Sequence, residues 1–110
     1  MLQPPSTQRS AHGDRPAPAL TVLLTLFGRH EFTPRWFAHA ARELAGHRVL
    51  VADGSRDDQA REMVRAAEAA HPELLIEYRR YAPDTGVADY QRKLGSAIAS
   101  ITTPYTMLAD

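Results

Sequence analysis

The sequence has 110 residues, enough for one small domain with a hydrophobic core. Lysine plus arginine and aspartate plus glutamate both number 13, so the net charge is zero. The basic excess of a general nucleic-acid-binding protein is therefore missing, and no nucleic-acid partner is expected. There is no cysteine, which excludes disulfides and thiolate metal sites. Without a membrane-span-sized apolar run or a signal-peptide pattern, a cytoplasmic domain is expected.

The first 19 residues differ in character from the rest of the chain. Residues 1–19 are rich in Pro, Ser, Gln and Arg and carry no periodic apolar pattern. Such a segment cannot bury enough apolar surface to offset the entropy lost on ordering. We therefore expect a disordered leader over residues 1–19 and an α/β domain over residues 20–110.

From Leu20 onward, apolar runs typical of buried strands alternate with stretches of helical periodicity. The runs cover residues 20–27, 48–52, 74–78 and 105–109. Apolar stripes at helical spacing lie between them, over residues 36–44, 60–70 and 87–101. This order predicts a Rossmann-like α/β fold, in which right-handed βαβ units build a parallel sheet of four strands with three helices.

Local signals mark the ends of the expected helices. Thr33 before Pro34 predicts the start of the first helix, with Thr33 as its cap. Gly46 is expected to end that helix in the left-handed conformation. Ser55 and Asp58 have the spacing of a capping box, which predicts the start of the second helix.

The candidate binding residues follow the expected strands, because ligands of open parallel sheets bind beyond the carboxyl ends of the strands. The Asp53 carboxylate can accept hydrogen bonds from a base or a ribose, and Gly54 lets a ligand approach the backbone. The same residues are also common in plain turns, and taken alone they favour that interpretation. Asp110, after the fourth strand, either ends that strand or helps to bind Mg²⁺ or Mn²⁺ together with substrate phosphates.

Three cationic residues could meet a diphosphate. Arg29 follows the first strand, and Arg92 and Lys93 lie on the third helix. For the helical pair, a solvated surface position is the alternative. The five histidines show no metal-ligand spacing, and neither G-x-G-x-x-G after the first strand nor a P-loop occurs.

Four segments in register resemble the opening of a family 2-type glycosyltransferase of GT-A fold. TVLLTLFGR (residues 21–29) resembles "VSIVIPTYNR", and VLVADGSRD (49–57) resembles "IIVVDDGSTD". QRKLG (91–95) resembles "ARNLG". TPYTMLAD (103–110) resembles "GEYILFLDSD", whose first aspartate belongs to the D-x-D metal motif. The order and spacing agree over nearly the whole chain from Leu20.

The resemblance implies a nucleotide-diphosphate-sugar donor and transfer of the sugar to a glycan, lipid or protein acceptor. Asp53 would contact the nucleobase, in a pocket lined by Thr25 and Phe27. Asp110 would lie at the ribose and at a divalent metal, Mg²⁺ or Mn²⁺, that bridges the diphosphate. The donor phosphates would lie near Arg92 or Lys93, and Arg29 completes the predicted nucleotide-sugar-binding set.

The chain also departs from the family pattern. Ala52 replaces an aspartate, Phe27 a tyrosine and Lys93 an asparagine. Family domains exceed roughly 200 residues, so the acceptor half and the catalytic base are expected beyond Asp110, and this stretch is expected to bind rather than catalyse. Two alternatives stay open. One is a non-catalytic nucleotide-binding or interaction module of doubly wound type. The other is a different α/β enzyme, although the acidic cluster of a receiver and the G-x-S-x-G of a hydrolase are missing.

Overall fold

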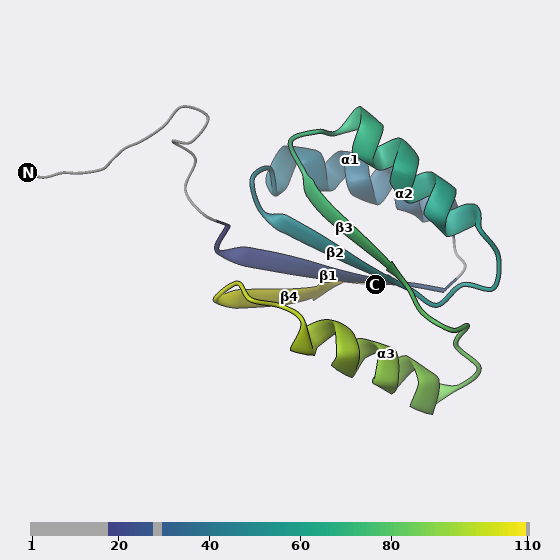
Figure 1. The fold of residues 1–110 in the computed structure, drawn as a ribbon. Helices are drawn as coiled ribbons and strands as arrows, with labels where there is room; N and C mark the ends of the chain where they lie inside the picture. The colour runs from purple at the N-terminus through teal and green to yellow at the C-terminus, as the bar shows by residue number, and fades with distance from the viewer. Residues whose placement is uncertain (1–17, 28–29, 110) are drawn as a thin grey trace, which may run out of the picture.

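The computed structural model describes residues 18–27 and 30–109, and within them the predicted α/β fold is confirmed (Figure 1). The strands form one all-parallel sheet in the order β3-β2-β1-β4. They are β1 (Leu20–Leu26), β2 (Arg48–Asp53), β3 (Leu75–Arg80) and β4 (Tyr105–Ala109). The helices are α1 (Thr33–Glu43), α2 (Gln59–Ala70) and α3 (Val87–Ala99), with a short 3-10 turn, η1 (His30–Phe32), before α1.

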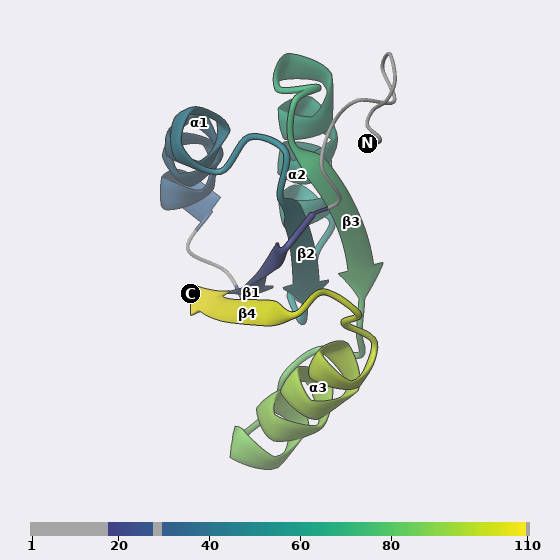
Figure 2. The same cartoon turned by 90° about the vertical axis from the view of Figure 1, so that its left-hand side faces the viewer.

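The helices divide between the two faces of the sheet. α1 and α2 cover one face and α3 lies on the other (Figures 1 and 2). The chain runs outward from β1 to β3 and then crosses back over the sheet to place β4 on the far side of β1. The strand order therefore reverses between β1 and β4, the position at which doubly wound folds bind ligands. No helix within the described ranges is long and apolar enough to cross a membrane.

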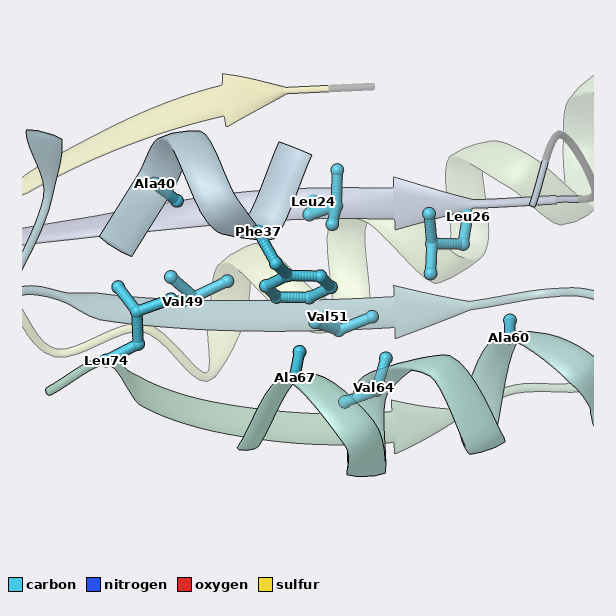
Figure 3. Packing of buried hydrophobic residues seen from close by; sticks show 10 residues of the cluster. All are labelled: Leu24, Leu26, Phe37, Ala40, Val49, Val51, Ala60, Val64, Ala67 and Leu74. Atoms are coloured by element: carbon cyan, nitrogen blue, oxygen red, sulfur yellow. The ribbon is translucent and has the colours of Figure 1, made fainter. Parts of the chain in front are cut away.

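Alternation along the strands gives each face its own core. Leu24 and Val51 point toward α1 and α2, where they meet Phe37 and Val64 (Figure 3). Phe37 is 1% exposed, and Trp36 packs edge-on against its ring at 5.1 Å between centroids. The strand side chains that point to the opposite face form a smaller core under α3. This core consists of Leu23, Leu50 and Ala52 from the strands and Ala97 from the helix.

The structure corrects the sequence prediction in two details, which concern where α1 and α2 begin. Thr33 is the first residue of α1 rather than its cap, because η1 leads directly into the helix. The predicted capping box at Ser55 and Asp58 is wrong, since α2 begins only at Gln59. The Gln59 amide donates instead to Asp57 Oδ1 at 3.1 Å. Gly46 has φ +87°, the left-handed conformation predicted for it.

Two elements are less buried than the apolar patterns predicted. β4 was expected as a buried strand, but it is an edge of the described sheet and its side chains from Tyr105 to Leu108 are exposed. On α3, Val87 and Ile98 are 72% and 49% exposed. Lys93, in contrast, is only 3% exposed. The helix is rotated so that this lysine, rather than Val87 or Ile98, faces the sheet.

The predicted leader lies almost wholly outside the described residues, which begin at Pro18. Ala19, the last residue assigned to it, accepts a hydrogen bond from the Tyr105 amide at 3.1 Å. The chain is therefore in contact with β4 immediately before β1 begins.

Candidate functional site at the carboxyl edge of the sheet

Backbone hydrogen bonds continue the sheet beyond the ends of its strands. Leu26 and Asp53 are register partners, and the Gly54 amide donates to Leu26 O at 2.9 Å. On the other side, Tyr81 N donates to Asp53 O at 2.8 Å and Asp84 N to Gly54 O at 3.0 Å. The turn after β2 is therefore held between the end of β1 and the loop of residues 81–86, which leads from β3 to α3.

Asp53 is fully buried at this edge, at 0% exposure. Side chains alternate along β2, so the Asp53 carboxylate points to the same face as Val49 and Val51, the face covered by α1 and α2. Oδ1 accepts the Ser55 amide at 2.8 Å, and Oδ2 accepts the Tyr78 hydroxyl at 2.5 Å. Burial, followed by this hydrogen bond, raises the pKa of Tyr78. The carboxylate thus fixes the turn that follows β2 and joins it to β3.

Lys93 and Asp84 form a buried ion pair on the opposite face. Lys93 Nζ lies 2.5 Å from Asp84 Oδ2 and 3.4 Å from Leu26 O. The side chains are 2% and 9% exposed. The ammonium also lies 5.3 Å from the ring centroid of Tyr90, one turn earlier on α3. Buried charges occur almost only when they are paired, so each of these residues depends on the other.

Gly54 is where the ion pair meets the turn. A Cβ atom at this position would lie 2.6 Å from Cγ and from Oδ2 of Asp84. Real Cβ contacts are essentially never that short, so Asp84 occupies the space that a side chain at position 54 would need. The glycine is required here for close approach, and the group it admits belongs to the chain itself.

Arg80, at the end of β3, holds the rest of the turn from outside. Its guanidinium donates to Asp58 Oδ1 and to Asp57 O, both at 2.6 Å, and to Ser55 O at 3.3 Å. The hydrogen bond from Arg80 lowers the pKa of Asp58. Residues 53–58 are therefore held from β3 by both Tyr78 and Arg80.

The other predicted site residues that the structure describes differ in how exposed they are and in which part of the fold they contact. Thr25 is 7% exposed and points to the same face of the sheet as Leu23, the face that α3 covers. Phe27 is 48% exposed, and the Arg56 guanidinium carbon lies 5.8 Å from its ring centroid. Arg92 is exposed on α3 and forms an ion pair with Asp89 of the same helix. Arg29 and Asp110 lie outside the described residues.

The structure thus brings Lys93 to the ends of β1 and β2, whereas Arg92, its neighbour in sequence, faces solvent. The Asp53 carboxylate and Thr25 belong to opposite faces of the sheet, with the backbone between them. A ligand that meets both must therefore lie across the strand ends rather than on one face.

The carboxylates described at this edge are poorly placed to bind the metal that the family resemblance implies. Within residues 18–27 and 30–109, no three His, Asp or Glu side chains gather as ligands. Asp53 already accepts two hydrogen bonds, and the Lys93 ammonium supplies the positive charge beside Asp84. The described carboxylates therefore do not themselves fit a divalent cation. The metal remains a prediction that rests on Asp110.

Four residues of the site escaped the sequence reasoning: Tyr78, Arg80, Asp84 and Arg56. None of the residues that directly follow the expected strand at 74–78 was singled out from the sequence. A signal for Asp84 existed, because Lys93 lies one residue from Leu94 and four from Ala97, within the apolar stripe of α3. A lysine in that position needs a buried acid. Tyr78 and Arg80 carried no comparable signal, since their partners depend on register.

Comparisons with known proteins add no identification. No protein-family model matches the chain, and no curated protein matches it.

Proposed function

We propose that this chain forms the donor-nucleotide-binding part of a family 2-type glycosyltransferase. The site would lie at the carboxyl edge of the sheet, where the strand order reverses between β1 and β4. The supporting observation is the organised turn after β2. Asp53, Gly54 and Ser55 are all buried, and they are held in place from β1, from β3 and from loop 81–86. Such an edge is pre-organised, which lowers the cost of ordering it when a ligand binds.

In this proposal Phe27 offers the exposed aromatic surface on which a base can stack, and Arg56 lies next to it. Asp53 reaches a base only if the turn shifts, because its carboxylate is fully covered. Two of its roughly four acceptor positions are in use, so a ligand N–H could be added without losing Tyr78. Arg29 and Arg92 are the proposed cations for the diphosphate, with a metal at Asp110.

The test is a titration of the ¹⁵N-labelled 110-residue chain with UDP and with GDP, each with and without Mg²⁺, followed by NMR. Binding is expected to change the amide chemical shifts of Phe27, of residues 53–56 and of residues 84–86. Asp53→Asn is expected to weaken binding by about tenfold, because one of the two acceptor oxygens becomes an NH2 group, which donates and cannot accept from Ser55, Tyr78 or a ligand N–H. Glu68→Gln, on the exposed surface of α2, is the matched control and should bind like the wild type.

Binding of neither nucleotide, or shifts at the amino ends of the strands, would overturn the proposal. Binding that is unchanged in Asp53→Asn would favour the second candidate, a non-catalytic doubly wound module. The observation that favours this candidate is the complete burial of Asp53 and the use of both its oxygens within the fold. Mg²⁺ serves as the diamagnetic probe of the metal, and stronger binding in its presence would support the role of Asp110.

A further inference from the structure

The buried pair of Lys93 and Asp84 joins segments that are far apart in sequence. Through its two contacts, the Lys93 ammonium ties α3 to loop 81–86 and to the last carbonyl of β1, that of Leu26. The Asp84 amide donates a hydrogen bond to Gly54 O at 3.0 Å, so Asp84 also contacts the turn after β2. One ion pair therefore connects three of the segments that border the carboxyl edge.

We propose that Lys93 and Asp84 act as a charged clasp that positions loop 81–86 against the ends of β1 and β2. Lys93 is then a positioning residue rather than a ligand of the donor phosphates. Where it concerns the donor, this inference rests on the proposed function. Its physical basis is that the ammonium already pairs with a carboxylate at 2.5 Å, in a lysine that is only 3% exposed.

The surroundings of the pair support a single arrangement. Gly54 leaves room for the Asp84 carboxylate, which contacts it more closely than any Cβ would allow. The Tyr90 ring lies 5.3 Å below the ammonium and favours a cation at that point. Asp84 Oδ1 is buried and has no hydrogen-bond partner among the described residues. Without Lys93 the whole carboxylate would be a buried charge without compensation, and loop 81–86 would have to open to hydrate it.

Amide hydrogen exchange, measured by NMR on the full chain without any ligand, tests the clasp. In Lys93→Met the Asp84 amide should exchange at least about tenfold faster, because loop opening breaks its bond to Gly54 O. The Tyr81 amide, bonded to Asp53 O at the end of the sheet, should stay within about twofold of the wild type. Arg65→Met is the matched control, since its guanidinium is exposed and paired within α2, which covers the other face of the sheet from α3 (Figures 1 and 2).

A second variant approaches the clasp from the other side. Gly54→Ala leaves both charges in place but puts a methyl group where Asp84 lies, so it should also accelerate exchange of the Asp84 amide. This variant decides the question if Lys93→Met does not fold. Exchange of that amide within about twofold of the wild type in the folded variants, or equal acceleration in Arg65→Met, would overturn the clasp.

A binding measurement separates positioning from direct phosphate contact. If Lys93 positions the loop, Lys93→Met should weaken uridine and UDP by the same factor, and likewise guanosine and GDP. If it contacts phosphate, only the diphosphates should lose affinity, which would overturn the positioning role. A wild-type chain that binds none of these compounds would contradict the proposed function, whereas the exchange result would still decide the clasp.

Discussion

At the scale of single residues, the hydrogen bond between Tyr78 and Asp53 shows how burial favours the protonated form of a phenol. The hydroxyl donates at 2.5 Å to a carboxylate that is fully covered, and ionisation of the phenol would place two negative charges side by side. Burial and the bond to Asp53 therefore raise the pKa of Tyr78. The native state holds the phenolic proton more tightly than the unfolded chain does. The stabilising contribution of Tyr78 is thus fully present below the ordinary tyrosine pKa of about 10 and is lost as the pH rises through the raised value.

We predict that Tyr78→Phe lowers the free energy of unfolding at pH 7 by about 1.5–3 kcal/mol, the range for a hydrogen bond to a charged group. Urea denaturation followed by circular dichroism measures this loss. Ultraviolet titration of the folded wild type should also contain one tyrosine component, absent from Tyr78→Phe, that ionises above pH 10. If the two titration curves differ by a component at or below pH 10, the hydrogen bond to Asp53 is not maintained in solution.

At the scale of elements, the turn between β2 and α2 is held from β3 as well as by its own Asp53 and Asp57. Arg80 reaches across to two backbone carbonyls and to the Asp58 carboxylate. The neighbouring Arg79 pairs instead with Glu77 of its own strand, at 2.7 Å. The two arginines differ in what they connect, which makes them a matched pair for experiment.

We predict that Arg80→Met accelerates amide exchange across residues 55–58 on the order of tenfold, because the guanidinium no longer holds the carbonyls of this turn. Arg79→Met should leave these amides unchanged. The bond from Arg80 lowers the pKa of Asp58, so its contribution is present above the ordinary value of 3.8 and is lost as the pH falls through the lowered value. Acid should therefore loosen the turn in the wild type and have less effect in Arg80→Met, and equal acid sensitivity of the two chains would contradict this account.

The sequence was sufficient for the order and type of the elements, because each apolar run and each stripe reports burial along a single element. It was insufficient where burial depends on a partner from elsewhere. Val87 and Ile98 fit the helical spacing, yet they are exposed because α3 turns Lys93 toward Asp84. Asp53 was identified from its position after β2, but its bond to Tyr78 follows from strand register, which a single sequence does not specify.

At the scale of the whole molecule, the two edges of the described sheet differ in how well they resist association with other strands. β3 carries Glu77, Arg79 and Arg80, and charged side chains on an edge discourage pairing with another strand. β4 has the uncharged sequence YTMLA, with exposed apolar side chains on both of its faces. Tyr105 and Met107 are 69% and 44% exposed on one face and Leu108 is 52% exposed on the other. An uncharged apolar edge of this kind is expected to aggregate.

We predict that the chain self-associates with rising concentration through β4, and that Met107→Lys suppresses this association without unfolding the domain. An exposed substitution changes stability by only about 0.5 kcal/mol, so the sheet should tolerate the lysine while its charge opposes strand pairing. Sedimentation velocity over a concentration series measures the effect. Leu75→Lys is the control, because Leu75 is 39% exposed on β3, whose edge is already charged. An equal reduction by both variants would show that the association does not depend on β4, and the difference in charge between the two edges would then lose its significance.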